Sequence, residues 1–446
     1  MQEVDKLIKK DTFQTLLVRI PVLIFSFLYS IFLIRMLGPE GNGLYSFIMA
    51  SIGLSMLVVG LDGQKSTLYH IARKEFESGK IMGISLLLYG TGSLITIAII
   101  GLLYLSEMPF SNFFIPEDSL NLFFVFFFLG SFVCQHFTAL FSTVIRGQKA
   151  FNYYNKYLFG AALFQVLLYG SGYLITLFYS DAISQKDLFG LILIAQFMLL
   201  LLSWYYYSKA FKEKVNFHIK SIRPSYVRYA RLGYINEIGH FLNKRVDVWF
   251  IEMFNGLKNL GFYALASQLT NFLLLAAAPV EEVLKPYLIG MEREEGNGVF
   301  TQYFRIVLVI IISLSLILFL CSSWLVPTFF GSDFLTAVLP LKILCLGVVF
   351  VNIKRMFINY NRSFNDLNIN NWGQWLGVVI TIILDIILIP PYGIVGAAWA
   401  SLAAYAATAL FLGGYIIINK GIKLKDLIAI RKDDILFIKS IIGQKF

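Results

Sequence analysis

Apolar runs of 18 or more residues recur along almost the whole chain, and they restrict its possible folds more than any other feature. A run of about that length lets an α-helix cross about 30 Å of hydrocarbon. Of the 446 residues, 58% are apolar and only 14% are charged, a balance far from that of soluble domains. We therefore predict an all-α polytopic membrane protein.

The hydropathy pattern predicts twelve transmembrane helices. Their ranges are 12–36, 43–64, 81–104, 119–143, 154–178, 187–208, 229–253, 260–283, 303–327, 334–356, 371–390 and 393–418. With residues near span ends assigned to the adjoining loop, the inside loops carry 30 Lys and Arg and the outside loops carry 3. This excess predicts that both termini are cytoplasmic. The net charge of +10 is then explained by contact with lipid headgroups, and no nucleic-acid partner is expected.

An internal repeat appears at an offset of 218 residues. GPEGNGLY at 38–45 aligns with GLKNLGFY at 256–263, and each segment follows the first span of one half. A second match has an offset of 216 and pairs Arg146 and Asn152 with Arg362 and Asn368. Because six spans separate equivalent positions, the halves have the same orientation, which implies a pseudo-twofold axis along the membrane normal.

We expect the two halves to form six-helix bundles, residues 1–213 and 214–446. The second bundle ends in a tail that alternates bulky apolar and basic residues after residue 420. That alternation favours an amphipathic helix on the membrane surface, with a disordered basic tail as the alternative.

The seventh span contains more polar groups than a lipid-facing helix tolerates. At 100° per residue, six of them fall within about a third of the helix circumference. They are Asn236, Glu237, His240, Asn243, Lys244 and Asp247. Charges inside a bilayer need protein partners or a watery cavity, so this stripe predicts a substrate or ion path. The alternative is a set of headgroup or structural ion contacts. Arg245 lies on the other side of the helix and is not expected to share the path.

The first span has a polar face of its own, as the repeat requires. Arg19 is aligned with Glu237 and lies on one side with four hydroxyl residues, Thr12, Thr15, Ser26 and Ser30. A Ser and Thr seam for close helix packing explains the hydroxyls but explains Arg19 less well. Pro21 follows Arg19 and favours a kink, because it removes a backbone hydrogen bond. Lys65 is expected at the inner mouth of the same path.

Several kinds of chemistry have no motif in the sequence. There is no Gly-rich loop that cradles phosphate, which argues against ATP hydrolysis, and no His, Cys and carboxylate cluster with metal-ligand spacing. Paired carboxylates on a large outer loop are also missing. We therefore expect a transporter and not an enzyme, with no cofactor and no metal.

Three stretches together resemble polysaccharide flippases of the Wzx type, members of the multidrug/oligosaccharidyl-lipid/polysaccharide exporter superfamily. They are LIRMLGPEGNGLYSF at 33–47, VDVWFIEMFNGLKNLGFYALA at 246–266 and LDIILIPPYGIVGAAWASLAAY at 384–405. The resemblance implies a V-shaped, MATE-like arrangement of the two bundles in the cytoplasmic membrane. The implied substrate is a polyprenyl-pyrophosphate-linked oligosaccharide, moved from the inner to the outer leaflet by alternating access. Antiporters of drugs and cations share the fold and are the alternative.

This resemblance also suggests roles for individual residues. A pyrophosphate needs cationic partners, and a sugar chain needs polar ones. The expected substrate-binding residues are Arg19, Lys65, His240, Asn243 and Lys244. Candidate carriers of a coupling H⁺ or Na⁺ are Glu237, Asp247 and Asp385, each of which can instead be a structural ion partner. Candidate hinge residues are Pro21, Gly43, Gly239 and Gly261. Within the stripe, we expect Asp247 to carry the coupling and Glu237 to pair with a cation.

Overall fold

The computed structural model describes residues 2–61, 63–74, 76–106, 108–179, 183–218, 220, 223–289, 291–364, 366–429, 431 and 434. Side chains are described for fewer residues. Those of 2–18 and 276–289, and of a few single positions such as Asn236, lie outside the description. Within these limits all the regular secondary structure is helical, as expected where lipid leaves backbone groups only intrahelical partners.

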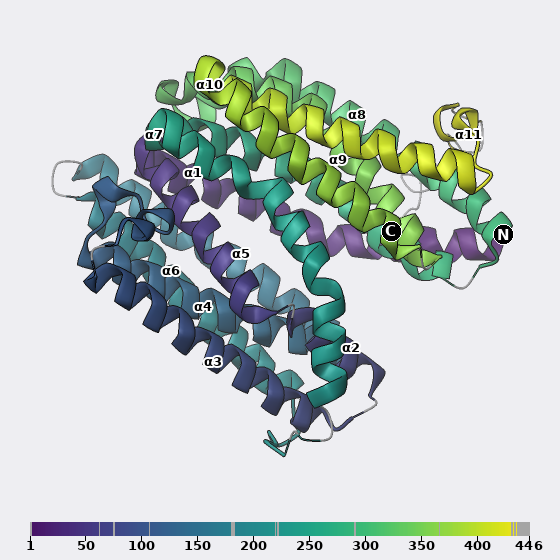
Figure 1. The fold of residues 1–446 in the computed structure, drawn as a ribbon, viewed down its shortest axis with the longest axis horizontal. Coiled ribbons are helices and arrows are strands. Elements are labelled where there is room, and N and C mark those ends of the chain that lie inside the picture. The colour runs from purple at the N-terminus through teal and green to yellow at the C-terminus, as the bar shows by residue number, and fades with distance from the viewer. Residues whose placement is uncertain are drawn as a thin grey trace. The chain divides into compact units, whose positions relative to one another are not determined.

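The long helices follow the predicted spans (Figure 1). Their bounds are α1 Gln2–Gly60, α2 Gly63–Arg73, α3 Ser78–Leu105, α4 Leu122–Gly147, α5 Phe151–Phe178, α6 Gln185–Ala210, α7 Arg223–Ile289, α8 Arg293–Phe330, α9 Val338–Ser363, α10 Leu367–Asn419 and α11 Leu424–Ile428. Short 3-10 helices lie at Pro109–Phe113, Glu117–Ser119 and Ser332–Ala337.

Eight helices among the described residues are long and apolar enough to cross a membrane. The chain is thus a multi-pass, all-helical membrane protein, and the count of twelve spans remains a prediction. Three long helices are interrupted by a glycine with non-helical dihedral angles: Gly38 in α1, Gly256 in α7 and Gly393 in α10. Gly38 and Gly256 fall in predicted connections between two spans, and Gly393 is the first residue of the twelfth predicted span.

Gly38 and Gly256 are equivalent under the offset of 218 and share one backbone conformation. Their φ and ψ angles are 63° and −177° at Gly38, and 76° and 172° at Gly256. Only glycine adopts this region without strain. Gly43 and Gly261 were expected at these turns. They instead lie in the helical segments that follow the turns, and both are buried. The repeat motif therefore encodes its turn at the first glycine and close helix packing at the later one.

Gly38→Ala and Gly256→Ala are each expected to destabilise the protein by about 1–3 kcal/mol, because a side chain at this φ and ψ is strained. An added Cβ would meet no atom within 4 Å at either position, so steric clash is not the cause. Thermal unfolding of the purified variants measures the effect. Gly101→Ala is the matched control, since Gly101 is helical and equally uncrowded. Equal stability of all three variants would contradict the assignment of strain.

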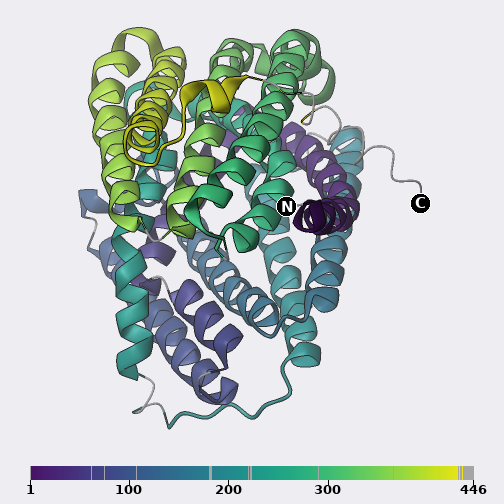
Figure 2. The same cartoon turned by 90° about the vertical axis from the view of Figure 1, so that its right-hand side faces the viewer.

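The chain divides into two compact units, residues 24–249 and residues 1–23 with 250–446. This division differs from the predicted repeat boundary at 213/214, which remains a prediction. In the unit 24–249, α4 packs against α3, α6 and α2 (Figure 1). Its core includes Ile81, Leu140 and Val144, all fully buried. The described part of the connection from α6 to α7 is extended (Figure 2), and the Asn216 amide donates to Gly79 O at 2.9 Å.

In the other unit, α9 packs against α8 and α10 around aromatic residues that include Phe300, Phe357 and Tyr360. The tail is bound to α8 by a buried ion pair. Arg305 donates from Nε and Nη2 to the two carboxylate oxygens of Asp434, at 2.7 and 2.8 Å. The part of the tail that the structure describes therefore lies against protein, while residues 435–446 of the predicted amphipathic helix lie outside the described residues.

Candidate functional site

A cavity of about 390 Å³ lies within the unit 24–249. Five helices line it. The lining residues are Gly53, Met56, Leu57 and Gly60 of α1, Gly63, Gln64 and Lys65 of α2, Tyr89 of α3, His136 of α4, and Glu237, His240, Phe241, Lys244 and Arg245 of α7. This volume is in the range of small-ligand sites. The lining contains three fixed cations, two imidazoles and one carboxylate, so its formal charge is positive.

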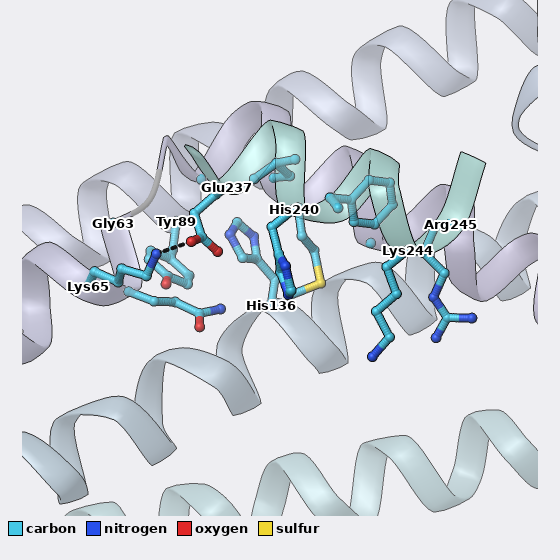
Figure 3. A pocket seen from close by; sticks show the side chains of 14 residues that line it. Gly63, Lys65, Tyr89, His136, Glu237, His240, Lys244 and Arg245 are labelled. Carbon is cyan, nitrogen blue, oxygen red and sulfur yellow. Dashed lines mark hydrogen bonds and ion pairs between the residues drawn. The ribbon is translucent and has the colours of Figure 1, made fainter. Parts of the chain in front are cut away.

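Figure 3 shows the order of these groups along the cavity. Lys65 and Glu237 are joined at one end, Lys244 and Arg245 lie at the other, and the rings of His136 and His240 lie between them. A ligand with two adjacent negative groups would therefore find cationic side chains at both ends and ring nitrogens in the middle.

The α7 side of the cavity follows from helix geometry. Glu237, Phe241 and Lys244 are four and three residues apart, so they lie along one face, with His240 and Arg245 at its two edges. Arg245, which the helix projection places away from the predicted stripe, also lines the cavity. The cavity is centred near Glu237 and Lys244 and not on the middle of the predicted stripe, so it reaches Arg245.

The other edge of the stripe is buried in protein. Asn243 and Asp247 are four residues apart and only 4% and 6% exposed, and neither lines the cavity. The side-chain amide of Asn243 has no hydrogen-bond partner in the described part of the chain. The structure therefore brings together Lys65, Glu237, His240 and Lys244 from the predicted set and separates them from Asn243 and Asp247.

Glu237 pairs with a cation, as expected, and that cation is Lys65 (Figure 3). The two residues are 172 positions apart in sequence, so the pairing depends on tertiary structure. Lys65 is in the first turn of α2, which begins at Gly63 after α1 ends at Gly60. The pair is solvated, with side-chain exposures of 44% for Lys65 and 25% for Glu237. Because its carboxylate and ammonium remain in contact with water, the pair can be broken at little cost.

Contacts at both ends hold the first part of α7 in place. Near its start, the buried Tyr226 hydroxyl donates to Gly63 O at 3.0 Å and lies 2.8 Å from Thr67 Oγ1. At residue 249, Trp249 Nε1 donates to Phe113 O at 3.0 Å, and the two rings stack with centroids 5.2 Å apart. These contacts fix the positions of the helices that carry Lys65 and the α7 cations.

Sequence reasoning also missed His136 and Tyr89. His136 lies within the fourth predicted span, 119–143, and carries no motif that singles it out. In the structure its ring stacks on Tyr89, with centroids 4.2 Å apart, and both residues line the cavity. The available signal was an ionisable group inside a predicted span, which is a reason to suspect function.

The remaining predicted residues lie elsewhere. Arg19 and Asp385 belong to the unit formed by residues 1–23 and 250–446. Arg19 is partly buried, and Asp385 is fully buried. Helical geometry continues through Pro21, since Gly38 is the non-helical position in α1. Gly239 is buried inside α7.

Comparison with known proteins gives a match to a protein family. The model of a family described as polysaccharide biosynthesis protein matches residues 8–292. An uncharacterized membrane protein of Methanocaldococcus jannaschii is 25% identical over 293 residues, which cover 62% of this chain and 56% of that protein. A probable low-salt glycan biosynthesis flippase of Haloferax volcanii is 22% identical over 196 residues, covering 43% of this chain and 42% of that protein. The chain thus spans about half the length of these curated relatives.

Solved structures share the fold. The lipid II flippase MurJ, in an inward closed conformation, has a TM-score of 0.72 at 16% identity, with coverage of 97% of this chain and 94% of that one. An inward-facing multidrug resistance MATE family transporter of the MOP superfamily has a TM-score of 0.66 at 13% identity, with coverage of 89% and 94%. These likenesses concern the fold alone.

Proposed function

Because this chain belongs to the polysaccharide biosynthesis protein family, we propose that it is a flippase for a polyprenyl-pyrophosphate-linked oligosaccharide. It moves the lipid-linked sugar from the inner to the outer leaflet of the cytoplasmic membrane by alternating access. Two six-helix bundles, twelve spans and a V-shaped arrangement are part of this proposal. The likeness to a flippase fold and to a glycan biosynthesis flippase supports it.

The observation that carries the proposal is the charge of the cavity. Lys65, Lys244 and Arg245 surround one carboxylate, Glu237. Cations hold pyrophosphate through charge-assisted hydrogen bonds, which are about twice as strong as neutral ones. Met56, Leu57 and Phe241 add apolar surface to the same lining, which reduces competition from water. An organic cation, the cargo of the alternative drug antiporter, would meet an excess of like charge here.

Glu237 can compete with a bound anion for Lys65. Its contact with Lys65 compensates one cation while no ligand is bound. An entering pyrophosphate carries more charge than one carboxylate and competes for Lys65. Release of Glu237 then makes it a candidate to take up a coupling ion. Asp247 and Asp385 remain the other proposed carriers, and Arg19 and Asn243 remain proposed substrate contacts.

Reconstitution tests the function. Proteoliposomes containing the full chain should move a fluorescent polyprenyl-pyrophosphate disaccharide between leaflets, read as its accessibility to an added quencher. Empty vesicles are the control. Accumulation of an organic cation without movement of the lipid-linked sugar would favour the antiporter instead.

An imposed proton or sodium gradient in the same vesicles tests whether flipping is coupled to an ion. If flipping by Asp247→Asn depends on the gradient as much as flipping by the wild type does, Asp247 is not the carrier.

Both termini are proposed to be cytoplasmic, on the basis of the charge distribution. Reporter fusions at Asp181 and Asn259 are expected to show an outside location, and a fusion at Lys214 an inside one. Activity of paired cytoplasmic and periplasmic reporters measures this. An inside report from Asn259 would contradict both the orientation and the repeat.

A further inference from the structure

His136 has a polar atom that the protein itself does not satisfy. The residue is only 1% exposed, and its Nε2 has no hydrogen-bond partner in the described part of the chain. Buried polar atoms of this kind are rare in folded proteins, and each lost partner costs about 1–3 kcal/mol. The ring lines the cavity together with Lys65, Lys244 and Arg245. A ligand in the cavity is therefore the natural partner for Nε2.

The ring cannot easily turn away from the cavity. It stacks on Tyr89, with an interplanar angle of 27°, and contacts Phe132 with ring centroids 5.0 Å apart. Its other nitrogen, Nδ1, lies 3.3 Å from Ser93 Oγ. Ser93 is four residues after Tyr89 on α3, so both contacts come from one helix face. Stacking and the hydroxyl together fix which nitrogen faces the cavity.

Ser93 also determines which ring nitrogen carries the proton. Ser85 and Thr96 on the same helix donate their hydroxyls to carbonyls four residues earlier, at 2.8 and 3.0 Å. Among the described residues, the one bond of the Ser93 hydroxyl is to His136. If Ser93 donates to Nδ1, only the Nε2–H group lacks a partner. The opposite tautomer would leave both the serine hydrogen and the Nε2 lone pair unsatisfied, so Nε2–H is favoured.

A glycine lies next to this N–H group. Gly60 lines the cavity at the end of α1, and a Cβ added there would meet a single atom within 4 Å, His136 Nε2 at 3.8 Å. Gly60 therefore puts no side chain on this side of Nε2. A phosphoryl oxygen at about 2.8 Å would have the usual geometry of a charge-assisted hydrogen bond.

We propose that His136 is a further substrate-binding residue, whose Nε2–H donates a hydrogen bond to an anionic oxygen of the diphosphate bound between Lys65 and the α7 cations. Ser93 is the positioning residue that holds this tautomer, and Gly60 keeps the approach open. This inference rests on the proposed function. An anionic oxygen is preferred to a sugar hydroxyl because an N–H donor bonds more strongly to a charged acceptor.

Titration calorimetry of the full-length protein in nanodiscs, with inorganic pyrophosphate as the probe, tests this proposal. His136→Phe keeps the stacking on Tyr89 but removes the donor, and it should weaken pyrophosphate binding about tenfold. His136→Gln places an amide N–H near the same point and should stay within about threefold of wild type. Gly60→Ala, which covers Nε2 with a methyl group, should weaken binding as His136→Phe does. Thermal unfolding confirms that each variant is folded.

A second readout separates a donor from a packing residue. The chain has four histidines, so ¹⁵N-histidine spectra can be assigned through the signal lost in His136→Phe. His136 should show the Nε2–H tautomer, and pyrophosphate should move its Hε2 resonance downfield.

Equal affinity of wild type and His136→Phe would overturn the role of His136 and leave the proposed function standing. Equal loss in the Phe and Gln variants would also overturn it, in favour of ring packing. Failure of wild type to bind pyrophosphate would remove both. If octyl glucoside alone moves the resonance, the partner is a sugar hydroxyl and the proposed anionic contact is wrong.

Discussion

Lys244→Gln is expected to weaken binding of inorganic pyrophosphate more than tenfold and to abolish flipping of the lipid-linked sugar in proteoliposomes. The physical reason is the loss of a charge-assisted contact inside a partly apolar cavity, where charge interacts more strongly than in bulk water.

Glu237→Gln is expected to act in the opposite direction on binding. It removes the anion that occupies Lys65, so pyrophosphate should bind about tenfold more tightly.

Calorimetry measures both affinities, and leaflet accessibility of the fluorescent substrate measures flipping. Lys258→Gln is the matched control, because it makes the same change of charge at an exposed residue that does not line the cavity. Wild-type flipping by Lys244→Gln would refute the role of the cavity cations. Weaker binding in Glu237→Gln would show that Glu237 supports the ligand and does not compete with it.

Arg305→Met is expected to lower the free energy of unfolding by about 3–5 kcal/mol, because it leaves a buried carboxylate without its cation. The side chains of Arg305 and Asp434 are only 4% and 3% exposed. Burial raises the pKa of Asp434, but hydrogen bonds from Arg305 and from the Arg431 amide outweigh this and hold it below its usual 3.8. The stabilisation is therefore present above the unfolded-state pKa and is lost as the pH falls through the lower folded-state value.

Thermal unfolding and limited proteolysis of the tail measure this effect. Arg305→Met combined with Asp434→Leu removes both charges and should recover most of the lost stability. Arg293→Met is the control at an exposed pair. Arg293 is 42% exposed, and its partner Asp366 also contacts Lys420 Nζ at 2.7 Å, so its loss should cost about 1 kcal/mol or less. Equal effects of Arg293→Met and Arg305→Met would show that the tail contact is not special.

Local properties of the chain were sufficient to predict its class and many of its helix positions. Apolar run length identifies membrane-crossing helices, because lipid forces each backbone group to bond within its own segment. The shared motif at an offset of 218 placed two connections near Gly38 and Gly256, where the structure has matching glycine turns. The excess of polar residues in the seventh span likewise pointed to α7, which supplies five of the fourteen residues that line the cavity.

Tertiary structure alone decided which of those polar residues share the cavity. A helix pattern gives the angle between side chains but not the direction in which the neighbouring helices leave space. Arg245 therefore entered the cavity against expectation, while Asp247 became buried on the opposite edge. Lys65 pairs with Glu237, which is 172 residues away in sequence. His136 lines the cavity because its ring stacks on Tyr89 and its Nε2 lies next to Gly60. The spacing of residues along one helix does not predict such contacts, because they depend on how separate helices pack.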